Sequence, residues 1–292
     1  MSPEAIVFSY GSKEDIDFYA DLSDRVPLDR FIMAIGGNFS EGYLNSLSKH
    51  KKLVVMYEKE RRGKYYSLMA GLSKARDFPL FLISGDIRVD DDVFSKVLNG
   101  LSDEREIVMP RVIPQNTKSL PEKIGSVIWA VHAFVNDYRY RRGKFFSCGE
   151  LQVISHPFPT DIPKVINEDE YLCEALSAAG FKLTYRKDIV VNNLVPRTIR
   201  DLMVQRIRIN IGHLQVAEMK GRTSSLSVSP FRELRTIAHL LVRIVVESPQ
   251  LMLYLPLTFV LEMLSVIIAI IKFRSGKIEL AWKIVNPGAE EA

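Results

Sequence analysis

Short apolar runs alternate with segments of helical periodicity over the first two hundred residues. Four runs each predict a short buried strand: residues 5–9, 31–35, 53–56 and 80–83. Helical spacing lies between them, over about residues 12–22, 41–48 and 63–76. This alternation predicts an α/β fold in which parallel strands form a sheet with helices on both faces.

The pattern continues after residue 120. It predicts helices over about 121–140 and 197–219, a turn and strand over 145–154, a helix over 168–179 ended by Gly180, and strand structure over 182–191. The polar, serine-rich segment 221–230 ends in Pro230 and is the best candidate for a linker. We therefore expect a catalytic domain over 1–220, a linker over 221–230 and a helical region over 231–292.

The C-terminal region is far more apolar than the rest of the chain. Residues 237–246 are largely apolar, and residues 251–271 form an apolar run that only Pro256 and Glu262 interrupt. That run just reaches the length that a bilayer requires. A glutamate near its middle is costly in lipid unless it is paired or faces protein.

Basic residues flank this region on both sides: Arg232, Arg235 and Arg243 before it, and Lys272, Arg274 and Lys277 after it. Such charges favour the cytosolic face, and a single span cannot place both of its ends there. We therefore favour a shallow hairpin bent at Ser248-Pro249, or helices lying in the membrane interface, over one full span. A buried helix or an oligomer interface is the remaining alternative, so self-association stays open.

Composition narrows the setting. The net charge of +4 does not by itself indicate nucleic acid, and none is expected as a partner. The two cysteines, Cys148 and Cys173, form neither a disulfide framework nor a metal motif, which favours a reducing compartment. The first residues lack the pattern of a signal peptide. We expect a membrane-associated protein whose catalytic domain lies on the cytoplasmic face.

The residues that follow the first four predicted strands should line one rim, where α/β sheets bind ligands. They are Tyr10-Gly11-Ser12, Gly36-Gly37-Asn38, Tyr57-Glu58-Lys59 and Ser84-Gly85-Asp86. A carboxylate such as Asp86 can hold a divalent cation that neutralises a diphosphate, and Gly85 lets the backbone approach a ligand. The alternative is an ordinary turn in which Asp86 caps the next helix.

Three charged segments at predicted helices could carry further chemistry. Residues 61–64 (RRGK) open a helix, where cations oppose the helix dipole, so a bound phosphate would offset the cost. Residues 168–170 (EDE) begin another helix, and Asp169 could take a proton from a hydroxyl. Gln205 and Arg208 share one helix face and could clamp a diphosphate. The alternatives are a solvated basic turn for 61–64, acidic residues that only stabilise a helix start for 168–170, and a solvated basic face near a membrane for Gln205 and Arg208.

The order of these motifs resembles that of family-2 glycosyltransferases. The motifs are VFSYGSKED, RRGKYYSLMAGLSKA, LFLISGDI, INEDEYLCEALSAAGFKLTY and QRIRI, and the resemblance covers about residues 5–212. It implies a GT-A fold, a Rossmann-like mixed sheet with flanking helices. It also implies inverting sugar transfer from a nucleotide-sugar donor with Mn²⁺ or Mg²⁺. The acceptor would be lipid-linked, or a glycan near the membrane.

The resemblance also implies roles for individual residues. Asp169 matches the catalytic base, with Glu168 beside it. Gly149 and Glu150 lie in a loop that resembles the one before the acceptor site. Asp86 matches a metal ligand, and His213, which follows the QRIRI segment, is a second candidate ligand. The candidate donor-binding residues are Ser9, Tyr10, Asn38, Lys64, Ser84, Gly85, Asp86, Gln205, Arg206 and Arg208.

The chain departs from the family pattern at three places. Gly36-Gly37 replaces an acidic pair, Ser84 replaces the first aspartate of the DxD motif, and Ile209 replaces the tryptophan of QxxRW. These departures keep two other hypotheses open. One is a degenerate member that binds nucleotide or a partner without turnover. The other is a nucleotidyltransferase, which the segments 168–180 and QRIRI disfavour.

Overall fold

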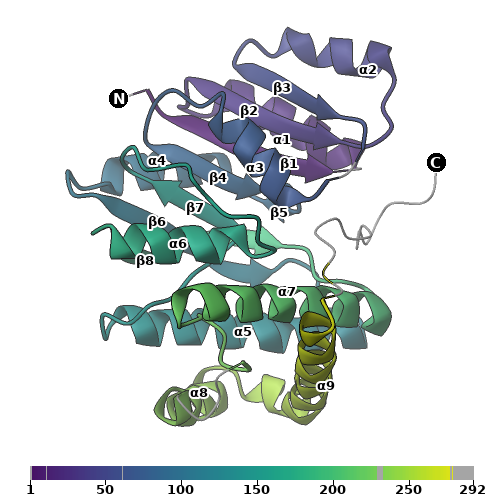
Figure 1. The fold of residues 1–292 in the computed structure, drawn as a ribbon, viewed down its shortest axis with the longest axis vertical. Coiled ribbons are helices and arrows are strands. Elements are labelled where there is room, and N and C mark those ends of the chain that lie inside the picture. The colour runs from purple at the N-terminus through teal and green to yellow at the C-terminus, as the bar shows by residue number, and fades with distance from the viewer. Residues whose placement is uncertain (1, 11, 61, 229–232, 277, 279–292) are drawn as a thin grey trace.

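The computed structural model describes residues 2–10, 12–60, 62–228, 233–276 and 278. Its centre is an eight-stranded sheet in the order β3-β2-β1-β4-β7-β6-β8-β5 (Figure 1). The strands are β1 (Glu4–Tyr10), β2 (Arg30–Gly36), β3 (Leu53–Glu58), β4 (Leu80–Ser84), β5 (Ile87–Arg88), β6 (Glu106–Pro114), β7 (Leu151–Ile154) and β8 (Lys182–Asn193). The main helices are α1 (Lys13–Arg25), α2 (Glu41–Ser46), α3 (Lys64–Leu72), α4 (Asp91–Gly100), α5 (Leu120–Tyr140), α6 (Glu168–Ala178), α7 (Ile199–Lys220), α8 (Leu234–Glu247) and α9 (Leu255–Arg274).

The sheet confirms the predicted α/β class and its mixed character. The four apolar runs of the first half form β1 to β4, which pair in parallel. β7 runs antiparallel to both of its neighbours, β4 and β6. β6 was not predicted, because Pro110 and Pro114 within it are typical of strand edges and turns. The ladder between β6 and β8 accommodates them with a register shift between Pro110 and Arg111.

Helices flank the sheet on both faces, as predicted. Residues 5 and 6 of β1 point to opposite faces because side chains alternate along a strand. Gly71 of α3 packs against Ile6, close enough that an added Cβ would lie 2.6 Å from it. Phe94 of α4 stacks on Phe31 and Phe81, which are the register partners of residue 5. α3 and α4 therefore cover opposite faces.

The long helices form a second layer beyond the β6–β8 side of the sheet. α5 and α7 lie between the sheet and the C-terminal helices α8 and α9 (Figure 1). Leu240 and Ile244 of α8 pack on Phe134 of α5, and Ala269 of α9 packs on Ile211 of α7. The apolar C-terminal region is thus part of the folded body on one side. Its chain bends after Glu247, at the predicted Ser248-Pro249 position.

α9 is, among the described residues, the one helix long and apolar enough to cross a membrane by length and composition. Much of α8 and α9 away from α5 and α7 is exposed and apolar, including Val242, Val246, Phe259 and Ile271. Of the predicted flanking cations, Arg232 and Lys277 lie outside the described residues.

The glutamate inside the apolar run faces protein. Glu262 forms a two-pronged ion pair with Arg206 of α7, at 2.8 Å and 2.9 Å. Asn210 and Ser227 also donate to its carboxylate, at 3.1 Å and 2.8 Å. Both charged side chains are largely buried, so each depends on the other for compensation. This pair fixes α9 on α7.

Removing one partner of this pair should destabilise the protein more than removing both. Glu262→Ala leaves Arg206 buried without a counter-charge and should lower the free energy of unfolding by about 3 kcal/mol. The double variant Arg206→Met/Glu262→Leu should lose clearly less. Chemical denaturation of the full chain, with Glu218→Ala on the exposed face of α7 as a control, measures both. Equal losses in the single and double variants would contradict this account.

Candidate active site

A cavity of about 830 Å³ opens at the carboxyl ends of β3 and β4 and continues between the long helices. Its volume lies within the range of small-molecule sites, roughly 300–1,000 Å³. The polar end is lined by Phe8, Asp15, Glu58, Lys64, Ser84, Gly85, Asp86, Gly149, Glu150, Glu168, Asp169 and Arg208. The rim predicted from the strand ends is therefore concave and carries both charge signs. Most of the predicted site residues meet here.

The turn at 84–86 is held firmly beneath this end of the cavity. The amide of Gly85 donates to the Phe8 carbonyl at 2.8 Å, and that of Ser84 donates to the Glu150 carbonyl at 2.9 Å. The buried Tyr19 hydroxyl contacts the Ser84 and Ile87 carbonyls, at 3.2 Å and 2.9 Å. These contacts fix the turn that carries Asp86.

The two side chains of that turn differ in what they contact. The Ser84 hydroxyl donates to the Gly149 carbonyl at 3.1 Å, so it serves the structure. No other side chain that the structure describes bonds to the Asp86 carboxylate, which is exposed to the cavity. The enclosing protein raises the pKa of Asp86, and the facing Lys64 opposes that rise. A single carboxylate open to a cavity suits a cation that takes its other ligands from phosphate and water.

Lys64 joins three separate segments. Its ammonium lies 3.0 Å from Glu168 and 4.0 Å from Asp169, and it donates to the Gly149 carbonyl at 3.4 Å. Burial alone would lower the pKa of Lys64, but the two carboxylates raise it above its ordinary value. A phosphate is thus not required to offset a cation at the start of α3, because α6 supplies that compensation. Arg62 pairs with Glu58, and Arg61 lies outside the described residues.

Asp169 lies directly against the loop predicted to face the acceptor. A Cβ added to Gly149 would stand 1.5 Å from Asp169 Oδ2, so a larger residue at 149 would require the Asp169 side chain to move. The side-chain amide of Gln152 connects this loop to α6, because it donates to the backbone carbonyls of Cys148 and Asp169, at 2.9 Å and 3.1 Å. The structure thereby brings Gly149, Glu168 and Asp169 together beside Lys64. Gln152 was not predicted, since a lone glutamine after a strand carries no motif.

Glu150 is a further carboxylate at this end of the cavity. Burial raises the pKa of Glu150 to about 7, and the negative charges of Asp169 and Asp86 add to this rise. The Cys148 thiol donates to the Glu150 carboxylate at 3.2 Å and opposes the rise. Both cysteines are buried and free, as expected for core residues.

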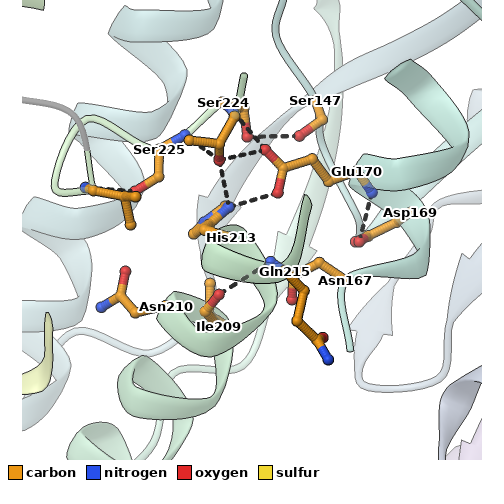
Figure 2. Close-up of polar contacts among 12 residues, drawn as sticks. Ser147, Asn167, Asp169, Glu170, Ile209, Asn210, His213, Gln215, Ser224 and Ser225 are labelled. Atoms are coloured by element: carbon orange, nitrogen blue, oxygen red, sulfur yellow. Dashed lines mark hydrogen bonds and ion pairs between the residues drawn. The ribbon is translucent and has the colours of Figure 1, made fainter. Parts of the chain in front are cut away.

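Glu170, the next residue of α6, connects the site to α7 and to the segment after it (Figure 2). Its carboxylate accepts from His213 Nδ1 at 2.6 Å, from the Thr223 hydroxyl at 2.7 Å and from the Ser224 amide. The described part of the predicted linker, residues 221–228, is therefore bound against α6 and α7. Residues 229–230 lie outside the described ones. The sequence did not predict this hydrogen-bond network, because the partners of Glu170 lie 43 to 54 residues away from it along the chain.

His213 lines the cavity but is engaged with Glu170, and its role as a metal ligand stays a prediction. Among the described residues, no three His, Cys, Asp or Glu side chains gather in a ready-made metal cluster. A cation in this cavity would thus depend on Asp86 and on oxygens of the ligand itself.

The candidate donor residues of α7 are divided in their contacts. Gln205 and Arg208 line the cavity, and the charge of Arg208 acts on both Lys64 and Asp86. The buried Arg208 Nε has no hydrogen-bond partner among the described residues. Arg206 also lines the cavity but is paired with Glu262, a contact that the sequence did not reveal. Arg208 is therefore the guanidinium most available to an anion.

The remaining donor predictions lie at the strand ends. Asn38 is exposed, and it is not among the described residues that line the cavity. Ser9 and Tyr10 end β1, but their side chains are outside the described part of the chain. Glu58 lines the cavity at the end of β3, among the strand-end residues predicted to form this rim, although no role was predicted for it.

Comparison with protein-family models gives no match, and comparison with curated protein sequences gives none. Solved structures do match. The mannosyltransferase PcManGT from Pyrobaculum calidifontis, in complex with GDP-Man and Mn²⁺, superposes with a TM-score of 0.63 at 18% identity, covering 95% of this chain and 88% of that one. A mycobacterial protein superposes with a TM-score of 0.50 at 12% identity, covering 77% and 76%. The chain therefore has the GT-A fold found in nucleotide-sugar glycosyltransferases.

The Glu170 network should make stability depend on acid pH. Burial tends to raise the pKa of Glu170, but the facing His213 and three hydrogen bonds lower it to about 2 from 4.5. A lowered carboxyl pKa stabilises the fold above the unfolded value, and the gain is lost as pH falls toward the folded value. Glu170→Gln should therefore cost about 3 kcal/mol above pH 4.5, and the difference should vanish toward pH 2.

Denaturation of wild type and variant across this pH range checks the expectation. Glu218→Gln, on the exposed side of α7, is the matched control and should follow the wild type. A cost of Glu170→Gln that stays constant with pH would show that the carboxylate charge is not what stabilises the network.

Proposed function

We propose that this chain is an inverting glycosyltransferase that uses Asp169 as its catalytic base. The observation that carries the proposal is that Asp169 lies against Gly149 in the same cavity that Asp86, Lys64 and Arg208 line. A base, a cation ligand and two cationic groups thus face one space of the size that a sugar nucleotide needs. The GT-A fold supports the same reaction class.

The proposed reaction is a single displacement. Asp169 accepts the proton of the acceptor hydroxyl as that oxygen attacks the anomeric carbon. The bond from that carbon to the diphosphate oxygen breaks with inversion, and the nucleoside diphosphate leaves. An acceptor phosphate, already an anion, would attack in the same geometry without proton loss.

Lys64 and Arg208 would stabilise the charge that develops on the leaving diphosphate. Mn²⁺ or Mg²⁺, held by Asp86 and by diphosphate oxygens, would supply further neutralisation. The similar mannosyltransferase holds GDP-Man and Mn²⁺, which supports a nucleotide-sugar donor and a divalent cation here. Glu58, near the end of β3, is positioned at the donor side of the cavity.

The acceptor side points to a membrane. The cavity reaches α8 and α9, whose outer surface exposes large apolar residues: Leu234, Leu241, Val242, Val245, Val246, Phe259, Val260, Leu264 and Ile271. A patch of this kind is typical of a membrane contact. We infer a cytoplasmic-face enzyme that acts on an acceptor at or in the membrane.

Asp169→Asn should abolish transfer while donor binding survives. The amide is nearly the same size but cannot accept a proton, so turnover should fall by a factor of about 10² to 10⁴. Nucleoside diphosphate affinity should change by less than a few-fold. Product formation and calorimetric binding measure the two effects, and Asp161→Asn, an exposed carboxylate outside the cavity, is the matched control. Turnover retained in Asp169→Asn would remove this residue from the mechanism.

Asp86→Asn should weaken donor binding only where a divalent cation contributes to it. Calorimetric titration of UDP, GDP, CDP and dTDP with and without Mn²⁺ identifies the base and the effect of the cation. We expect one nucleotide to bind about tenfold or more tightly with Mn²⁺, and the Asn variant to lose that increment. An unchanged Mn²⁺ effect in the variant would make the metal assignment wrong.

A member of this fold that binds nucleotide without turnover is the second candidate. It is favoured by the Ser84 hydroxyl, which is committed to the Gly149 carbonyl and leaves Asp86 as the single carboxylate of its turn. Nucleotide binding in the titrations above, with neither donor hydrolysis nor transfer for any nucleotide sugar, would support this candidate.

A further inference from the structure

The cavity has a second half that the donor chemistry does not use. Beyond Asp169 and Glu150 it continues between α5, α8 and α9, where the walls are apolar. Ile128, Val131 and Val135 line it from α5, Leu240 and Leu241 from α8, and Phe259 from α9. We call this part the apolar arm. The diphosphate and the sugar hydroxyl groups of a nucleotide sugar would find few free partners along these walls.

The polar groups along the apolar arm are already engaged with one another. Arg206 and Glu262 line it but form their own ion pair. His132 Nε2 donates to the Ser147 carbonyl at 3.2 Å, and burial lowers the pKa of His132 to about 4, so the ring is neutral at physiological pH. The apolar arm thus offers contact area rather than charge. Such a surface selects an apolar occupant.

The apolar arm reaches the exposed apolar face of α8 and α9. Leu241 and Phe259 line it and are also 43% and 64% exposed. They adjoin the outward residues Val242, Val245 and Val260 on the same two helices. A chain that starts in the lipid phase therefore meets continuous apolar surface from outside the protein to the carboxylates at the centre of the cavity.

We propose that the apolar arm holds the hydrocarbon chain of the acceptor. The acceptor is then an amphiphile with a long aliphatic chain, and its terminal hydroxyl or phosphate lies beside Glu150 and Asp169. This assignment rests on the proposed glycosyl transfer and adds to it the place and chemical nature of the acceptor chain. What supports it is the continuity of one cavity from the charged end to the exposed apolar face.

The test uses the position of Trp129, which lines the cavity next to Ile128. The chain has two tryptophans, so Trp282→Phe leaves Trp129 as the sole emitter in the full-length protein. The probes are n-alkyl phosphates and n-alkanols with chains of about 4 to 12 carbons, together with versions brominated near the chain end. Bromine quenches tryptophan emission on contact. Because Trp129 also borders a second cavity beside residues 249–254, quenching reports a chain inside the apolar arm when the narrowing variants described below relieve it.

We expect affinity to rise about fourfold for each added methylene, which corresponds to about 0.8 kcal/mol per buried CH₂, until the apolar arm is full. Brominated long chains should quench Trp129. Comparison of phosphates with alkanols of equal length then shows whether the head is anionic or neutral. Affinity independent of chain length, or long chains that bind without quenching, would overturn the proposal.

Two narrowing variants separate the apolar arm from the outer face. Val131→Phe fills it from α5, and Leu241→Phe narrows its exposed mouth and is the easier variant to fold. Each should weaken the longest probe about tenfold or more and leave nucleoside diphosphate binding within about twofold. The matched control is Val246→Phe, also on α8, 73% exposed and outside the cavity lining. Equal losses in all three variants would place the chain on the outer surface and refute the assignment.

Transfer assays keep this proposal distinct from the proposed function. If long chains bind and quench Trp129 but no nucleotide sugar supports transfer, the assignment of the apolar arm stands and the proposed transferase activity is wrong. Transfer to acceptors at a rate that ignores chain length in wild type and in Leu241→Phe would keep the transferase and overturn the apolar arm.

Discussion

The amino end of α6 carries three successive carboxylates, and each of them faces a different part of the molecule. Glu168 binds Lys64 at the start of α3, Asp169 rests against Gly149, and Glu170 binds His213 and the segment after α7. Successive residues of a helix point about 100° apart, so three neighbouring side chains in one turn can contact three different parts of the molecule. The relation among the donor end, the candidate base and the long helices depends on this turn.

The strength of that arrangement comes from mutual compensation of charge. Lys64 would be unfavourable at the start of a helix, and Glu168 would be unfavourable in the interior, yet each neutralises the other. The same rule holds for Arg206 and Glu262 at the contact of α7 with α9. Charge is thus buried at two junctions, and both junctions border the same cavity. Elements that would otherwise slide past each other are fixed at these points.

The sequence predicted what local periodicity encodes. β1 to β4, the helices from α5 to α7 and the positions of Asp86 and Asp169 follow from patterns of a few neighbouring residues. It did not predict β6, because two prolines obscure its apolar pattern. Nor did it predict the partners of Arg206 or Glu170, which lie 56 and 43 to 54 residues away. Those pairings depend on tertiary packing, and a polar, serine-rich segment bound along a cavity has the same composition as a free linker.

The missing Cβ of Gly149 has a consequence for comparing related chains. Even a methyl group at 149 would overlap Asp169 Oδ2 where that oxygen now lies, so any larger residue there requires the Asp169 side chain to turn away. Residues 149 and 169 should therefore be compared together in related chains. Where a divergent chain retains both, the close packing of this loop on the amino end of α6 can be kept. A larger residue at the first position signals that the second has moved or changed its task, whatever the rest of the chain resembles.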